Sequence, residues 1–315
     1  VSVRCLMCDP LLPVSVTIVA SENPAPVGSL VTFSAIPVNG GSDPIYEWKV
    51  NGIMASVSQN PVFTYVPAFN DIISCVLISN EECVIGNPAT SNAITMNMTA
   101  LVCPGYPTVE YEGVTYTTVL IGTQCWLAQN LNVGTRIDVY AQQENNGNIE
   151  KYCYDNLESN CDIYGGLYQW DELMAYATSS NANPSGRRGI CPPGWHVPSK
   201  AEWCQMETSL DPAVDCSITG WQVSDLGGKM KEPGTIHWNS PNLGATNESG
   251  FTALGAGEKR DYCDFTDLKR ATLFWTSFEF STKYAWHIIL LYNSDQFSQN
   301  YYTKTYGYSA RCVKD

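Results

Sequence analysis

The stretch "RRGICPPGWHVPSKAEW", residues 187–203, joins a cysteine to a run of rigid residues. Its three prolines exclude a regular helix here, because proline lacks an amide hydrogen and clashes with the preceding turn. We therefore predict a rigid turn in which Cys191 is a candidate disulfide partner.

A helix is predicted directly after this turn. Ser199 and Glu202 have the spacing of a capping box, in which the serine side chain and the glutamate side chain each accept from the other residue's amide. We expect a helix from about Lys200 to Leu210. Three apolar side chains share one face of it, namely Trp203, Met206 and Leu210.

Composition narrows the class of protein. The 315 residues suffice for two domains. The formal net charge of −14 argues against nucleic acid as a partner. The chain contains no run of apolar residues long enough for a transmembrane helix, so none is predicted.

The cysteines indicate an oxidising compartment. The chain has 13 scattered cysteines and only 3 histidines, which favours disulfides over zinc sites. We therefore predict an extracellular or cell-surface location.

The N-terminal part has the pattern of a β-sandwich. Residues 1–11 are predicted to form an arm, and residues 12–100 contain short alternating runs separated by turn residues. Trp48 and Cys75 resemble the strand C tryptophan and strand F cysteine of an immunoglobulin-like sandwich. Phe33 is expected where the partner cysteine would lie. Cys75 must then pair elsewhere or stay free, and we predict a bridge to nearby Cys83.

Composition changes at "MTALVCPGYPTVEYEG", residues 98–113, which we interpret as the domain boundary. Beyond it, residues 165–180 and the stretch after Pro198 are predicted to be helical, and the C-terminal part is rich in strand-forming residues. We expect an α+β domain with long loops over residues 103–315.

Residues 103–315 resemble the Fibrobacter succinogenes major paralogous domain. The matching stretches include "GVTYTTVLIGTQCWLAQNL" (113–131), "YGGLYQWDELM" (164–174), "GICPPGWHVPSKAEW" (189–203), "GWQVSDLGGKMKE" (220–232), "HWNSPNLGATNESGFTALGAG" (237–257) and the ending "YSARCVKD" (308–315). Residues 12–100 resemble the immunoglobulin/PKD-like repeats of Bacteroidota surface proteins, through "YEWKVNG" (46–52) and residues 71–96. The resemblance implies a C-type-lectin-like fold and surface display or secretion, with no established ligand or reaction.

The resemblance also implies a disulfide framework. The "GIC" stretch and the "RC" ending are hallmarks of the family, so Cys191 is paired with Cys312. Three further pairs are predicted: Cys103–Cys125, Cys153–Cys161 and Cys204–Cys216. Three cysteines remain for intermolecular bonds or free thiols, namely Cys5, Cys8 and Cys263.

We expect no catalytic activity. The chain lacks GxSxG and HExxH motifs, and lacks the reactive cysteine pair of the related formylglycine-generating enzymes. Asp171, Glu172 and Glu232 could form an acid/base pair, but the first two are expected on a solvated helix surface.

A ligand site is predicted on the long loops around residues 238–251 and 275–286, where amides and aromatic rings coincide. Its candidate residues are Trp238, Asn239, Asn242, Asn247, Glu248, Trp275 and Trp286. Tyr284, Tyr301 and Tyr302 are further candidates for stacking on a sugar. No cofactor is required, and calcium is a candidate at Asn242, Asn247 and Glu248, because calcium prefers oxygen ligands.

These observations predict a secreted or surface-displayed structural or adhesive protein, as a subunit of an extracellular fibre or the tip of an adhesin. Its expected partners are copies of itself or other surface proteins. Residues 1–11 would add a strand to a neighbouring copy and so build a filament, or would instead be the stub of a preceding repeat that packs on its own sandwich. The alternative is a lectin-like carbohydrate-binding module with glycans as partners, and a secreted enzyme ranks third.

Overall fold

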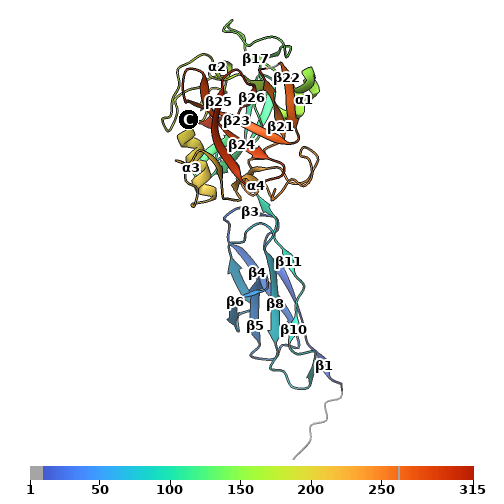
Figure 1. The fold of residues 1–315 in the computed structure, drawn as a ribbon. Helices are drawn as coiled ribbons and strands as arrows, with labels where there is room; N and C mark the ends of the chain where they lie inside the picture. Colours follow the sequence, from blue (N-terminus) through green and yellow to red (C-terminus); the bar gives the residue numbers. More distant parts are fainter. Residues whose placement is uncertain (1–9, 262) are drawn as a thin grey trace, which may run out of the picture. The chain divides into compact units, whose positions relative to one another are not determined.

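A computed structural model describes residues 10–261 and 263–315. The chain divides into two compact units, Val1–Thr99 and Ala100–Asp315 (Figure 1). Both units are rich in β-strands. Among the residues described, no helix is both long enough and apolar enough to cross a membrane.

The first unit is built from two small sheets. One sheet has the order β2-β4-β7, and the other has the order β10-β8-β5-β6 with β11 also paired to β8. Two short parallel pairs, β1 with β9 and β3 with β12, complete the unit. Its strands are β1 (Leu12–Pro13), β2 (Ser15–Ala20), β3 (Ala25–Pro26), β4 (Val31–Val38), β5 (Ile45–Val50), β6 (Ile53–Ser58), β7 (Val62–Tyr65), β8 (Ile72–Ile78), β9 (Val84–Ile85), β10 (Ala89–Thr90), β11 (Ile94–Thr95) and β12 (Met98–Thr99).

One hydrophobic core holds the two sheets together. Side chains alternate between core and solvent along β2, β4 and β8, as the two-residue period of a strand requires. Trp48 on β5 lies opposite Cys75 on β8, and both are fully buried. Phe33 is buried in the same core, as predicted.

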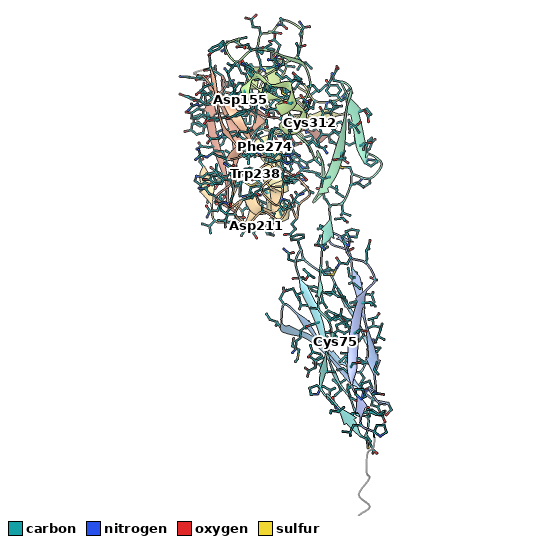
Figure 2. The ribbon with its side chains drawn as sticks, turned by 90° about the vertical axis from the view of Figure 1, so that its right-hand side faces the viewer. Cys75, Asp155, Asp211, Trp238, Phe274 and Cys312 are labelled. Atoms are coloured by element: carbon teal, nitrogen blue, oxygen red, sulfur yellow. A yellow bond between two sulfur atoms is a disulfide. The ribbon has the colours of Figure 1, made fainter. Side chains whose placement is uncertain are left out.

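The predicted Cys75–Cys83 bridge is wrong. The Cys75 thiol is free and buried (Figure 2). Cys83 is disulfide-bonded, so its partner is a residue other than Cys75. Cys75 lies in the middle of β8 with its side chain in the core, while Cys83 lies beyond the end of that strand. Cys5, Cys8 and most of the predicted arm lie outside the described residues.

The second unit contains two larger sheets. A five-stranded sheet has the order β13-β14-β15-β27-β19, and an eight-stranded sheet follows the path β18-β26-β23-β24-β25-β20, with β21 paired to β23 and β22 paired to β21. A short pair, β16 with β17, lies apart from them. The strands are β13 (Thr108–Tyr111), β14 (Val114–Ile121), β15 (Gln124–Leu127), β16 (Thr135–Arg136), β17 (Glu150–Lys151), β18 (Leu167–Tyr168), β19 (Trp195–His196), β20 (Gly220–Gln222), β21 (Ala256–Arg260), β22 (Asp264–Leu268), β23 (Ala271–Glu279), β24 (Tyr284–Leu291), β25 (Phe297–Thr303), β26 (Tyr308–Ser309) and β27 (Val313–Lys314).

The helices of the second unit are short. They are the 3-10 helix η1 (Tyr154–Asn156) and the α-helices α1 (Glu158–Tyr164), α2 (Trp170–Leu173), α3 (Lys200–Leu210) and α4 (Leu226–Met230). The prediction for α3 is confirmed, including the capping box. The predicted helix over 165–180 is wrong beyond α2, because Ala175 and Tyr176 turn the chain into the left-handed region, with φ of 47° and 58°.

The stretch that precedes α3 is fixed to the C-terminal strand. β19 pairs antiparallel with β27, and the predicted Cys191–Cys312 bridge is present beside this pair. His196 on β19 lies 2.6 Å from carboxylate oxygens of both Glu202 on α3 and Asp315. The other bridges predicted for this unit are confirmed as well: Cys103–Cys125, Cys153–Cys161 and Cys204–Cys216.

Two hydrophobic clusters cover the two faces of β23. Phe274 belongs to the cluster that includes Trp203 of α3, whereas its neighbour Trp275 belongs to the cluster that includes Tyr168 and Cys191. The sheet is therefore buried on both faces over most of β23. The site described below lies on the same face of the sheet as Trp275, and Tyr306 and Tyr308 of that cluster take part in it.

Candidate functional site

Two of the predicted ligand-binding tryptophans belong to the core. Trp238 and Trp275 are fully buried (Figure 2 shows Trp238 in the interior of the unit). Their indole nitrogens donate to backbone carbonyls, Trp238 to Ala253 and Trp275 to Tyr168, each at 2.9 Å. They lie in different hydrophobic clusters. The structure therefore does not bring them together on a surface that could stack against a ligand, and the prediction is wrong for these two residues.

The predicted calcium loop is held by its own side chains. The Asn242 amide donates to the carbonyls of Glu232 and Gly234, and Asn247 exchanges hydrogen bonds with Thr252. Both asparagines have positive φ, which suits their role in tight turns. Asn239 is exposed and Glu248 is partly exposed. Within the described ranges, no cluster of three histidine, cysteine or acidic side chains could hold a metal ion.

A buried lysine supplies the cation at this loop. Lys231 is fully buried, and its ammonium donates to the carbonyls of Leu243, Leu291 and Ser294 at 2.7–2.9 Å. Burial lowers its pKa to about 8, which Asp295 partly opposes. Lys231 thus links the loop to the end of β24. Its ammonium group lies among carbonyl oxygens, which are also the ligands that often bind a metal cation.

Trp286 belongs to a separate aromatic group on the opposite face of β24 from His287. The ring of Tyr301 stacks on Phe280 at 3.8 Å and meets Trp286 edge-on at 5.3 Å. The Lys200 ammonium lies 4.7 Å from the centre of the Trp286 ring. This group packs rings against one another and leaves Phe280 half exposed.

The carboxylates considered for catalysis have structural partners. Glu172 is buried, contrary to the expectation of a solvated helix surface. It accepts hydrogen bonds from the Glu150 amide and the Tyr176 hydroxyl, both at 2.9 Å. Glu232 lies 2.8 Å from His237. Among the described residues, no hydrogen bond joins Asp171, Glu172 and Glu232 to one another.

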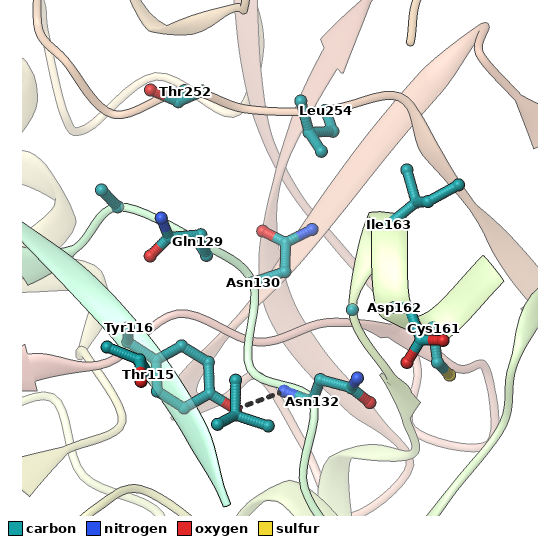
Figure 3. Close-up of a pocket in the computed structure, with 13 residues that line it drawn as sticks. Thr115, Tyr116, Gln129, Asn130, Asn132, Cys161, Asp162, Ile163, Thr252 and Leu254 are labelled. Carbon is teal, nitrogen blue, oxygen red and sulfur yellow. Dashed lines mark hydrogen bonds between the residues drawn. The ribbon is translucent and has the colours of Figure 1, made fainter. Parts of the chain in front are cut away.

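An enclosed pocket of about 210 Å³ lies between β14 and α1 (Figure 3). Its polar groups are already engaged. The Tyr116 hydroxyl accepts from the Asn132 amide at 2.9 Å, and Asn130 binds both Arg311 and the Tyr164 carbonyl. Because these amides stabilise the fold, the pocket offers few groups to a ligand.

A second pocket combines aromatic rings with polar groups, of which Asn300 accepts from the Tyr301 amide at 2.9 Å and Tyr308 is hydrogen-bonded to Glu258. It has a volume of about 360 Å³ and lies on one face of β24 and β25. His287 and Asn300 face each other across the two strands, and Tyr302 lies on the same face. We name this pocket the tyrosine site. Its polar and aromatic lining residues are Glu258, Arg260, His287, Asn300, Tyr302, Tyr306 and Tyr308.

The rings of the tyrosine site form a chain from solvent to core. Tyr302 is 45% exposed and meets Tyr306 edge-on at 4.7 Å, and Tyr306 meets the buried Tyr308 at 6.1 Å. A smaller pocket of about 230 Å³ shares Tyr302 and Tyr306 and adds Lys283 and Tyr284. The two pockets together make an elongated surface.

Two titratable groups of the site have strongly shifted pKa values. Burial, assisted by the charge of Asp267, raises the pKa of Glu258 to about 7. Burial lowers the pKa of His287 to about 3, so its imidazole is neutral. The Nδ1 atom of His287 makes no well-formed hydrogen bond with the described residues, although the ring interacts with the Ala285 backbone and the side chain is only 2% exposed. An unpaired buried polar atom in a pocket indicates a place where a ligand group can bind.

The tyrosine site lies within a known sequence family. The model of the Fibrobacter succinogenes major domain matches residues 119–314. The chain belongs to this family. The match includes every residue of the tyrosine site, three complete disulfides and Cys125 of the fourth. No curated protein matches the chain.

One further buried acid of the Fibrobacter succinogenes major domain lies on α3. Glu207 is fully buried and accepts from the Gln299 amide, and burial raises its pKa to about 8. The unfolded chain releases this proton near pH 4.5. The folded domain therefore binds more protons between these values, and the contribution of Glu207 to stability falls as the pH rises through them.

We expect the substitution Glu207→Gln to remove this loss of folding stability at high pH. Urea unfolding at about pH 9 should show a variant that is about 1–3 kcal/mol more stable than the natural protein, with a smaller difference at about pH 5. Asp162→Asn, which removes an exposed carboxylate, is the control and should change stability little at either pH. A Glu207→Gln difference that does not depend on pH would contradict the assignment.

Sequence analysis did not predict most of the residues that line the tyrosine site. Glu258 lies in a charged run, "GEKRDYCD", that is typical of a solvated hairpin. The available signal was the two-residue period of a strand. It places Glu258 and Arg260 on one face of β21 and the buried Lys259 on the other. Tyr302 was among the predicted sugar-stacking residues. Cys263, in the same hairpin, is a partly buried free thiol among the described cysteines.

Proposed function

We propose that this protein is an extracellular, surface-displayed adhesive protein whose second unit binds carbohydrate at the tyrosine site. The carrying observation is the site itself, a pocket in which an exposed tyrosine ring adjoins an amide, a carboxyl group and an unpaired imidazole nitrogen. An aromatic face packs against the apolar side of a sugar ring, and the polar groups match its hydroxyls. The four described disulfides of the second unit support a location in an oxidising compartment.

We also propose a finer description of the two units. The paired sheets of the first unit, with Trp48 opposite Cys75, support an immunoglobulin-like sandwich. The disulfide-bonded second unit, with short helices and long loops, supports a C-type-lectin-like fold. In this proposal the first unit serves as a spacer, and the second unit carries recognition. Assembly into a fibre through residues 1–11 remains a prediction.

The proposal predicts that Tyr302→Ala weakens carbohydrate binding. A glycan array with the full chain should identify bound oligosaccharides, and titration should show at least about tenfold weaker binding by the variant. Tyr140→Ala is a matched control, since Tyr140 is an exposed tyrosine that lines neither pocket of the tyrosine site. The array is repeated with a calcium chelator, and we expect the binding to persist.

Two results would count against the proposal. Unchanged affinity of Tyr302→Ala for every bound glycan would exclude the tyrosine site. Binding that disappears with the chelator would instead favour the predicted calcium residues Asn242, Asn247 and Glu248. A thermal unfolding curve for each variant separates lost binding from lost folding.

A further inference from the structure

Glu258 is a carboxyl group in the tyrosine site that shares the pocket with one cation, Arg260, which is already paired with another carboxylate. The nearest guanidinium, that of Arg260, donates from two nitrogens to Asp264 on the adjacent strand β22. Lys259 points to the other face of β21, where its ammonium lies 4.8 Å from the centre of the Tyr152 ring. Arg260 therefore compensates the charge of Glu258 only in part.

The remaining surroundings of Glu258 are acidic or neutral. The carboxylates of Asp264 and Asp267 raise its pKa, while Arg260 and the Tyr308 hydroxyl lower it without overcoming burial. His287, across the pocket, is neutral. The described groups that face Glu258 from the packed elements are thus Arg260, Asp264, Asp267, His287, Tyr302, Tyr306 and Tyr308.

We propose that the sugar recognised by the tyrosine site carries a protonated amine, which lies against the Glu258 carboxylate and the rings of Tyr302 and Tyr306. This inference rests on the proposed carbohydrate function and assigns the class of sugar. An ammonium group is attracted to the faces of aromatic rings, and the attraction increases where water is excluded. It also adds to the partial compensation that Arg260 gives the Glu258 carboxylate.

The same charges argue against an acidic sugar. A uronic acid in this pocket would bring its carboxylate close to Glu258, and close to Asp261 in the adjoining pocket. Like charges at such a distance disfavour each other strongly in a partly buried site. Lys283 is the cation of the adjoining pocket, and its ammonium lies 5.5 Å from the centre of the Tyr284 ring.

Binding of an amine should depend on pH through Glu258. Only the ionised carboxylate pairs with an ammonium, and a larger fraction of Glu258 is ionised as the pH rises through about 7. Affinity should therefore increase over this range until the ligand amine loses its own proton. Because the ammonium stabilises the ionised form of Glu258, binding should release protons to the buffer.

The test compares oligomers of equal length that differ only in the amine. Glucosamine oligomers, N-acetylglucosamine oligomers and galacturonic acid oligomers are titrated calorimetrically into the full chain at about pH 6, where the glucosamine amines are mostly protonated and Glu258 still holds a proton to release. We expect the glucosamine oligomer to bind about tenfold or more tightly than the acetylated one, with proton release that differs between buffers. The acidic oligomer should not bind.

Glu258→Gln isolates the carboxylate while it preserves the shape of the side chain. In this variant the preference for glucosamine and the proton release should both disappear, while acetylated oligomers bind as before. Because the protein is acidic overall, Glu82→Gln serves as a control for unspecific attraction, since Glu82 is exposed in the first unit. That variant should keep the preference.

The outcomes distinguish this inference from the proposed function. If Tyr302-dependent binding occurs but both oligomers bind equally, or if Glu258→Gln keeps the preference, the amine assignment is wrong and the carbohydrate site stands. If the array and the calorimetry find no oligosaccharide bound by the folded full chain, both are wrong. Loss of preference in Glu82→Gln as well would show that net charge, not the site, attracts the amine.

Discussion

Arg311→Ala should destabilise the second unit by about 3–5 kcal/mol. The substitution removes a charged donor from the core and leaves its four oxygen acceptors without this partner. Arg311 is 1% exposed, and its guanidinium donates to the Asn130 side chain and to the carbonyls of Leu127, Phe251 and Thr252. It also lies 4.1 Å from the centre of the Phe251 ring. One side chain therefore joins three separate segments of the unit.

The measurement is urea unfolding of the second unit, followed by tryptophan fluorescence. Arg311→Lys should recover part of the loss, since an ammonium keeps the charge but cannot reach all four acceptors. Arg270→Ala is the matched control, because Arg270 is largely exposed and its ion pair with Asp267 is worth at most about 1 kcal/mol. An effect of Arg311→Ala no larger than this control would contradict the role assigned to the buried guanidinium.

Removal of the Cys191–Cys312 bridge should have an effect of similar size. The two cysteines are 121 residues apart, and closing a loop of this length restricts the unfolded chain by about 4–5 kcal/mol in the chain-entropy model. The double substitution Cys191→Ala and Cys312→Ala should lower the free energy of unfolding by about this amount under non-reducing conditions. Calorimetry or urea unfolding measures the change.

The Cys153–Cys161 bridge provides the comparison. Its cysteines are also buried, but they are only 8 residues apart, which corresponds to about 2–3 kcal/mol. The double alanine variant of this pair should therefore be clearly more stable than that of the long loop. Equal losses for the two pairs would show that loop length does not control their contributions.

Local signals in the sequence were sufficient for the elements that depend on near neighbours. The capping box of Ser199 and Glu202 determines where α3 begins, because both partners lie within one turn of the chain. The disulfides of the second unit followed from the resemblance to a family. The error at Cys75 has a geometric origin, since closeness along the chain does not reveal that its side chain points into a core.

The candidate site could not be predicted, because it depends on segments that are distant in sequence. Glu258, His287 and Tyr302 come from three strands, and only the register of β24 and β25 places His287 and Tyr302 on one face. The tryptophans produced the opposite error, since side chains predicted to bind a ligand are buried in the core. Trp238 precedes a loop rich in polar residues, yet its side chain is fully buried in the core.

The position of β27 has a consequence for how the protein is made. This strand is among the last parts of the second unit to be synthesised, yet it pairs in the middle of its sheet, between β15 and β19. In a growing chain, β15 and β19 therefore lack the strand that lies between them until residues 311–314 have emerged. Cys191 lacks its disulfide partner for the same time. The short-range bridges Cys153–Cys161 and Cys204–Cys216 can close earlier. Oxidative folding should thus be ordered, with the longest loop closed last, and a polypeptide interrupted before β27 would expose a reactive thiol.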